Sequence, residues 1–286
     1  MFKWYGLIGI LMVGFAEANF FFKIQPLANW YFPIIWFGYI LVLDAVIYKL
    51  KGNSLISNRF EQFLGMVILS ALFWWIFEFI NIPVHNWSYS NVDFLETGVK
   101  AAVSNAGNLK NIFGTIAFST VLPAFFETAE LIRSLHIFDK FKLPKKYKIS
   151  KKLLISMVIF GIICFVAPIF LPTFAFPLVW MSFFFILDPI NYLHKQPSII
   201  KHLEDRNLVI PLSLLLAGIV MGFFWEFWNY WAITKWTYSL PFVNFFKIFE
   251  MPILGYLGYF PFAFELYAMY WFVRSLFIKK EKLLAI

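Results

Sequence analysis

Charged residues are scarce in this sequence of 286 residues. Asp, Glu, Lys and Arg together make up 14% of it, whereas a soluble globular chain contains about 25%. Apolar residues make up 61%, against about 45–50% in soluble proteins. This composition excludes a soluble enzyme, a disordered tail and a collagen-like chain, and it indicates an integral membrane protein.

Cysteine and histidine are also scarce. The single cysteine, Cys164, cannot form an intrachain disulfide, and it lies in an apolar run where a small buried side chain is expected. With four histidines and one cysteine, a multi-histidine metal site is not expected, and no motif implies a cofactor. The net charge of +8 is interpreted as basic cytoplasmic loops, so no nucleic-acid partner is expected.

Long apolar runs are the main feature of the sequence. A helix needs about 20 apolar residues to cross the hydrocarbon core of a bilayer. Eight runs come close to or exceed that length, which predicts an all-α polytopic membrane protein. The predicted transmembrane helices lie at 4–22, 30–48, 60–81, 111–135, 153–170, 172–193, 208–232 and 252–277.

The distribution of lysine and arginine predicts the orientation of these helices. The two termini and the second, fourth and sixth loops share one side of the membrane. That side carries Lys3, Lys49, Lys51, Arg59, Arg133, the lysines between 140 and 152, Lys195, Lys201, Arg206, Arg274, Lys279, Lys280 and Lys282. The other side carries Lys23, Lys100, Lys110, Lys235 and Lys247. Because basic residues collect in cytoplasmic loops, both termini are expected in the cytoplasm.

The N-terminus has a second interpretation. Lys3, an apolar run and then Ala16-Glu17-Ala18 resemble a cleavable signal peptide. The apolar run resumes at once with Phe20, Phe21 and Phe22, which favours a retained first helix.

The chain contains an internal duplication. Leu43-Asp44 and Leu187-Asp188 are followed by Tyr, Lys, Ser and Ile at identical spacing. Glu78 and Asn81 precede Trp87-Ser88-Tyr89-Ser90, just as Glu226 and Asn229 precede Trp236-Thr237-Tyr238-Ser239. Pro123 and Pro261 each stand four residues before a glutamate, and each is expected to kink its helix beside that acid. This order predicts two four-helix repeats, 1–138 and 153–286, joined by a basic cytoplasmic linker, 139–152. Because each repeat has an even number of spans, the repeats share one orientation, about a pseudo-twofold axis along the membrane normal.

Carboxylates lie deep in the predicted spans. An Asp at the centre of a membrane helix costs about 2.5 to 3.5 kcal/mol on insertion scales. Six form pairs related by the duplication: Asp44 and Asp188, Glu78 and Glu226, Glu127 and Glu265; Glu17 is a seventh. Intramembrane acids usually mark functional sites. The six paired acids are the candidate catalytic residues, with Glu226 and Glu265 the first choices for acid and base. By contrast, Glu130 and Arg133, three residues apart, are expected to form a pair on a helix surface.

An internal cavity between the repeats is expected to hold these acids. Its candidate substrate-binding residues are Asn81, Asn229, Trp225, Trp228, Trp236, Tyr238, Trp87 and Tyr89. Each Asn shares a helix face with its Glu, and the Trp and Tyr residues either anchor the protein at the bilayer surface or cap the cavity.

Buried acids among aromatic rings favour an enzyme that protonates an apolar isoprenoid, carotenoid-like or lipid substrate. A carboxylic acid can protonate a double bond, and aromatic faces stabilise the resulting cation. In class and composition the chain is similar to small membrane-bound terpene and carotenoid cyclases and to carotenoid hydratases. Such chemistry is cyclisation, hydration or isomerisation, and the partners would be the lipid bilayer and an apolar small molecule.

Two alternatives stay open. Parallel repeats and intramembrane acids also suit a small proton-coupled transporter or permease, in which a homodimer would compensate for the short chain. A structural or lipid-binding subunit would explain the hydrophobicity, with each acid hydrogen-bonded to a neighbouring helix and no cavity.

Overall fold

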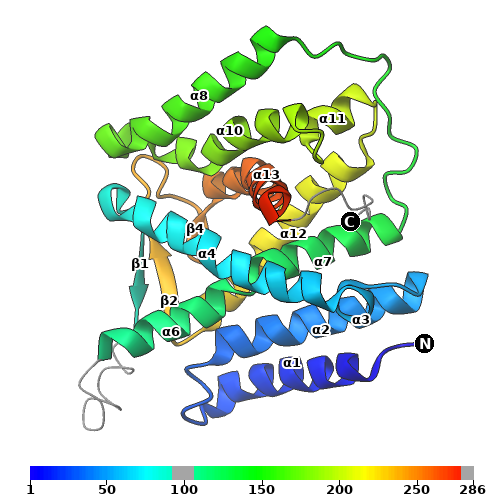
Figure 1. Cartoon of the computed structure of the whole chain (residues 1–286). Helices are drawn as coiled ribbons and strands as arrows, with labels where there is room; N and C mark the ends of the chain where they lie inside the picture. Colours follow the sequence, from blue (N-terminus) through cyan, green and yellow to red (C-terminus); the bar gives the residue numbers. More distant parts are fainter. Residues whose placement is uncertain (92–105, 278–286) are drawn as a thin grey trace.

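The chain is mostly helical, as a computed structural model of residues 1–91 and 106–277 shows (Figure 1). Its main helices are α1 (Trp4–Phe22), α2 (Tyr31–Lys51), α4 (Phe60–Val84), α6 (Ala106–Phe118), α7 (Val121–Ser134), α8 (Lys151–Phe170), α10 (Val179–Leu193), α12 (Val209–Trp231) and α13 (Tyr259–Phe277). Short helices are α3 (Leu55–Asn58), α9 (Pro172–Ala175), η1 (Phe176–Leu178), α11 (Ile199–Glu204) and η2 (Ile253–Gly258). The strands are β1 (Trp87–Ser90), β2 (Lys235–Tyr238), β3 (Lys247–Ile248) and β4 (Met251–Pro252). Lys100, Lys279, Lys280 and Lys282, used above for orientation, lie outside the described residues.

Seven helical segments of the described chain are long and apolar enough to cross a membrane, which indicates an integral membrane protein. They correspond to the first seven predicted spans. The eighth, α13, is not among the seven because it carries Glu265, Arg274 and several tyrosines that lower its mean hydropathy.

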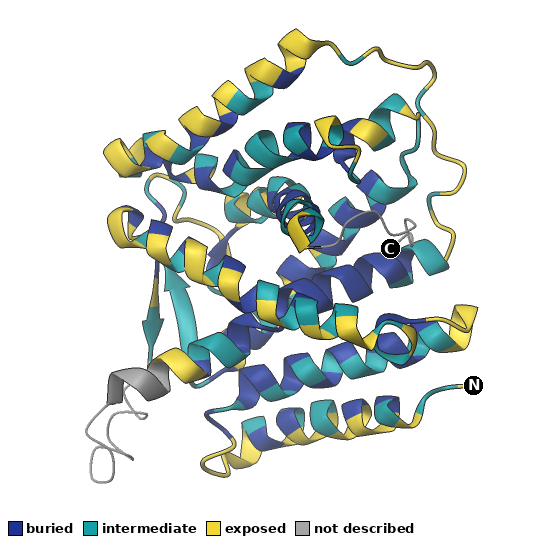
Figure 2. Cartoon of the chain, viewed as in Figure 1, coloured by how far each residue is buried: buried dark blue, intermediate teal, exposed yellow. Residues whose placement is uncertain are grey.

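Exposed residues lie along the outer helices of the bundle, among them α1 and α8 (Figure 2). On α1, Leu7 and Leu11 are exposed, and on α8, Ile159 and Ile163 are exposed. These two helices occupy corresponding places in the predicted repeats, and each packs mainly on one neighbour, α2 or α10. Exposed apolar faces of this size match a lipid environment.

The two prolines predicted to distort their helices stand just after helix interruptions. The predicted span 111–135 is divided into α6 and α7 at Ser119 and Thr120, and the span 252–277 begins as η2 and continues as α13 from Tyr259. Pro123 has no N–H to donate to the carbonyl of Ser119. Ser70 bridges this interruption, because its Oγ donates to Phe118 O at 2.5 Å and accepts from Leu122 N at 2.9 Å.

A two-stranded antiparallel ribbon joins the two halves of the chain. Trp87 pairs with Tyr238, Ser88 with Thr237, and Tyr89 with Trp236. Exchanging each residue for its counterpart in the duplication reproduces the same pairs, so a local twofold axis passes between Ser88 and Thr237. The ribbon lies at one end of the helices, and the N-terminus lies at the other (Figure 1).

The halves also interlock through tryptophans at matching positions. Trp36 on α2 packs against Trp225 on α12, with ring centroids 5.9 Å apart. Its counterpart Trp180 on α10 stacks on Phe77 of α4 at 5.4 Å, and Phe77 stands where the second half has Trp225. A tryptophan from each half therefore packs against a helix of the other half, and these rings form part of the core between the halves.

Candidate functional site

An aromatic cavity of about 440 Å³ lies beneath the ribbon and is lined by both halves of the chain. The first half contributes Trp74, Trp87 and Tyr89, and the second contributes Trp180, Trp225 and Tyr238. Glu78 also lines it. Five of the predicted substrate-binding residues therefore reach one cavity, namely Trp87, Tyr89, Trp225, Trp236 and Tyr238.

Glu78 presents one carboxylate oxygen to three donors. Its Oε1 accepts from Tyr89 Oη at 2.5 Å, Trp87 Nε1 at 2.9 Å and Trp74 Nε1 at 3.1 Å. Burial and the neighbouring Glu78 raise the pKa of Tyr89 well above its usual value of 10, so this hydroxyl stays protonated and donates. Within the described chain Oε2 has no hydrogen-bond partner, which leaves it available at the cavity wall.

Glu226 is fully buried and is held by two tyrosines. Its Oε1 accepts from Tyr238 Oη at 2.6 Å and from Tyr259 Oη at 2.7 Å. Trp236 Nε1 in turn donates to Tyr238 Oη at 2.6 Å. Burial and Glu226 raise the pKa of Tyr238 well above 10, so it too remains a donor. Oε2 of Glu226 is buried and has no partner among the described residues. The two tyrosines line the cavity, and Glu226 stands directly behind them.

The two carboxylates obtain a similar donor from different helices. Trp74 donates to Glu78 from one helical turn away, but its counterpart in the duplication is Gly222. Tyr259 occupies the space over that glycine, since a Cβ on Gly222 would lie 2.4 Å from the tyrosine ring. The counterpart of Tyr259 is Val121, which cannot donate. The exchange of Trp74 and Val121 for Gly222 and Tyr259 therefore preserves a donor to each acid.

Asn81 and Asn229 fasten the helices to the ribbon. Asn81 Nδ2 donates to Trp87 O at 2.8 Å, and Asn229 Nδ2 donates to Trp236 O at 2.8 Å. The Oδ1 of each accepts from the N–H of the same tryptophan, at 3.4 Å and 2.9 Å respectively. Both amides are thereby engaged by backbone. Neither lines the cavity, although both were predicted to contact substrate.

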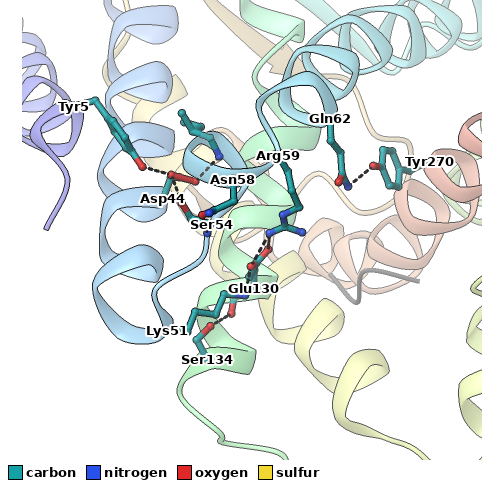
Figure 3. A network of polar contacts seen from close by, with 11 residues as sticks. Tyr5, Asp44, Lys51, Ser54, Asn58, Arg59, Gln62, Glu130, Ser134 and Tyr270 are labelled. Carbon is teal, nitrogen blue, oxygen red and sulfur yellow. Dashed lines mark hydrogen bonds and ion pairs between the residues drawn. The ribbon is translucent and has the colours of Figure 1, made fainter. Parts of the chain in front are cut away.

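Asp44 and Asp188 hold short helices at the opposite end of the bundle from the ribbon. Asp188 accepts from Ile199 N at 2.7 Å and Ile200 N at 2.9 Å, at the start of α11. Asp44 accepts from Ile56 N at 2.8 Å and from the hydroxyls of Ser54 and Tyr5 at 2.7 and 2.5 Å (Figure 3). Both oxygens of Asp188 and Oδ2 of Asp44 accept from backbone N–H groups, as an acid at a helix N-cap does, and neither acid lines the aromatic cavity.

Glu127 and Glu265 lie at mid-helix and also outside this cavity. Glu265 Oε1 accepts from Phe183 N at 2.8 Å and Ser182 Oγ at 3.3 Å, while its Oε2 has no partner among the described residues. Both oxygens of Glu127 are buried and lack a partner in the same part of the chain. The six paired acids therefore do not share one hollow.

Two further predicted residues make contacts that sequence spacing does not reveal. Trp228 Nε1 donates to Glu17 Oε1 at 3.0 Å, which joins α12 to α1. Glu130 does not form the expected surface pair with Arg133. It is buried and pairs with Lys51 and with Arg59, whose Nη2 lies 3.0 Å from Oε1 (Figure 3). A charge removed from water needs such partners, and here they are Lys51 at the end of α2 and Arg59 just before α4.

The cavity residues that sequence reasoning missed include Trp74, Trp180 and Tyr259. Trp74 had a local signal, because residues four apart share a helix face and Glu78 was already a candidate. Trp180 was not among the predicted cavity residues, and Tyr259 had no signal because its contact with Glu226 depends on the space above Gly222.

The site offers carboxylates, phenols and indoles. In the part of the chain that the structure describes, no group of three His, Cys, Asp or Glu residues is placed to hold a metal ion. No family model, no curated protein and no solved structure matches this chain, so its function is argued from geometry and chemistry alone.

Proposed function

We propose that this chain is an intramembrane enzyme that protonates a carbon–carbon double bond of an apolar isoprenoid, carotenoid-like or lipid substrate. The observation that carries the proposal is an aromatic cavity with Glu78 in its wall and the tyrosine-bound Glu226 behind it. Most residues that line the cavity are apolar or aromatic, and its volume of about 440 Å³ is within the range of small-molecule sites.

Glu78 takes the role of the acid in this proposal. Three donors hold Oε1, so the proton to be transferred is carried by Oε2, the oxygen without a partner in the described chain. Transfer of this proton to one alkene carbon leaves a cation on the other, and the faces of Trp180 and Trp225 stabilise it. Loss of a proton from a neighbouring carbon completes an isomerisation or cyclisation, and addition of water completes a hydration.

Glu226, the first choice for the acid, takes a different role in this proposal. Glu226 has its own route to the cavity through Tyr238 and Tyr259, whose hydroxyls donate to its Oε1. Glu226 is therefore proposed as the base. It accepts the proton lost from the cation through the hydroxyl of Tyr238 or Tyr259. Glu265, the earlier choice for a base, is assigned a structural role beside Phe183 and Ser182.

A comparison of lipid extracts tests the proposal. Cells that express the wild-type chain are compared with cells that express Glu78→Gln, and apolar lipids are resolved by chromatography and mass spectrometry. We expect a product that depends on the wild-type chain and falls by a factor of about 100 or more in Glu78→Gln, since a general acid contributes about 10² to 10⁴ to the rate. The substrate should accumulate, with the same mass as the product or with one water molecule less.

Glu61→Gln is the matched control, because Glu61 is exposed on the same helix α4. It should leave the product unchanged. Equal lipid profiles for wild type and Glu78→Gln, at equal protein levels, would refute the enzyme proposal.

A second candidate, a proton-coupled transporter, is supported by another observation. A second cavity, of about 670 Å³, is lined by Ala129 of α7 and Tyr267 of α13, farther along the two helices that also line the aromatic cavity. Glu265 lies on α13 between Phe262, which lines the aromatic cavity, and Tyr267, whereas Glu127 lies on α7 next to Phe126, which lines the second cavity. A transporter would show counterflow of a solute in vesicles that Glu127→Gln abolishes and Glu78→Gln does not.

We propose the membrane arrangement on the same grounds. All eight predicted spans cross the bilayer as two four-helix repeats about an axis along the membrane normal, with both termini in the cytoplasm. Matching contacts of Asn81 and Asn229, matching contacts of Asp44 and Asp188, and the symmetric ribbon support the repeats. The basic linker at the end opposite the ribbon supports the orientation.

A further inference from the structure

The second cavity has a chemistry different from that of the first. It lies between α7, α10, α11, α12 and α13, and α11 is at the end of the molecule opposite the ribbon (Figure 1). Its wall contains the cations Arg133, Lys195 and Lys201 together with Glu204 and Asp205. This is a charged cavity, whereas the aromatic cavity has Glu78 and Lys235 as its only charged lining residues in the described chain.

Two buried donors in the wall of this cavity lack a hydrogen-bond partner among the described residues. Ser213 Oγ and Trp271 Nε1 have no hydrogen-bond partner among the described residues, although Ser213 is only 1% exposed and Trp271 only 4%. A buried donor without a partner costs about 1 to 3 kcal/mol, so such groups usually face a ligand or water.

The positive charge is also incompletely compensated. Lys201 Nζ lies 2.9 Å from Glu204 and 2.9 Å from Asp205, so both acids are already paired. Arg133 and Lys195 form no ion pair within the described part of the chain. Burial lowers the pKa of His202 to about 4, so at pH 7 it is neutral and is engaged by Tyr267 Oη at 2.9 Å.

Another part of the wall is apolar. Phe126, Ala129 and Leu214 line the side of the cavity that faces the core of the bundle. A ligand that satisfies the whole cavity must therefore carry an anionic group rich in acceptors at one end and an apolar portion at the other. A phosphate group fits the first requirement, because its oxygens accept from guanidinium, indole and hydroxyl donors together.

We propose that this second cavity binds the phosphate group of an amphipathic phospholipid, with Arg133 as the main anion-binding residue and Ser213 and Trp271 as supporting donors. The apolar wall and the position at the end of a membrane bundle favour a lipid over a free phosphate. The proposed chemistry of the aromatic cavity is not required, because the two cavities have no lining residue in common.

Native mass spectrometry of the full-length protein in a neutral detergent tests this site. The probe is dioleoyl phosphatidic acid, and diacylglycerol with the same chains is the matched ligand without phosphate. We expect one phosphatidic acid to bind per chain. We expect about tenfold or greater weakening in Arg133→Gln, and about threefold in Ser213→Ala, from the loss of one charged or one neutral hydrogen-bond donor.

Lys148→Gln is the control, because Lys148 is an exposed cation in the linker that does not line the cavity. It should bind the lipid as the wild type does. Unchanged binding in both Arg133→Gln and Ser213→Ala would overturn the proposal, as would diacylglycerol binding as tightly as phosphatidic acid. Inorganic phosphate that binds as tightly as the lipid would overturn the lipid assignment and identify a free phosphate as the ligand.

Discussion

At the residue scale, the hydrogen-bond partners of each buried carboxylate separate structural from chemical roles. Asp188 accepts two backbone N–H groups, one with each of its oxygens, so that both oxygens have a partner. Glu78 accepts three side-chain donors on one oxygen and keeps the other at a cavity wall. Sequence position alone gave these two acids equal standing, because both are repeat-related acids in an apolar run. The difference depends on donors brought from other parts of the fold.

Gly222 tests the packing behind Glu226. Gly222→Ala should destabilise the protein by about 1 to 3 kcal/mol, because the new Cβ would overlap the Tyr259 ring. In a Tyr259→Val background the overlap disappears, and Gly222→Ala should be neutral or stabilising by up to about 1 kcal/mol from helix propensity. Thermal unfolding in detergent of the two single variants and the double variant measures this coupling. Additive effects would show that the ring does not occupy the space above the glycine.

At the element scale, the long helices were predictable and their attachments were not. Composition and length gave seven of the spans, and Pro123 indicated where 111–135 would be interrupted. The ribbon was not predicted, because Trp87 and Tyr238 come from opposite halves of the chain and nothing in either segment specifies the other. The short helix α11 was missed because it is fixed by an acid 11 residues earlier rather than by its own periodicity.

The attachment of α11 provides a second prediction. Asp188→Asn replaces one acceptor oxygen with an amide N–H that would face a backbone N–H, at a cost of about 1 to 3 kcal/mol. We expect faster hydrogen exchange at Ile199 and Ile200 together with a lower unfolding temperature. Asp205→Asn is the control on the same segment, since Asp205 is exposed. Unchanged exchange in Asp188→Asn would contradict the anchoring role.

At the scale of the whole molecule, the two halves of the chain make many of the same contacts, as the sequence duplication predicts. They differ at the aromatic cavity. Asn81 and Asn229 make the same two backbone contacts, and the ribbon is symmetric about Ser88 and Thr237. The cavity beneath the ribbon breaks that symmetry, because Glu78 lines it while Glu226 stands behind two tyrosines. A sequence comparison of the halves identifies both acids but cannot show which one reaches the hollow.

The proposed orientation can be measured by cysteine labelling. In a Cys164→Ser background, Ser88→Cys should react with a membrane-impermeant maleimide in intact cells, because Ser88 is exposed on the ribbon. Lys148→Cys, in the basic linker, should react after permeabilisation only. The reverse pattern would invert the topology, and labelling of both positions from one side would contradict a membrane between them.

An experimental density map of the purified protein in lipid nanodiscs shows most directly whether the aromatic cavity holds a substrate against Glu78. We expect elongated non-protein density in the cavity of about 440 Å³, between Trp180 and Trp225 and in contact with Oε2 of Glu78. A Glu78 side chain turned away into a neighbouring helix, with protein side chains filling the space beneath the ribbon, would contradict it.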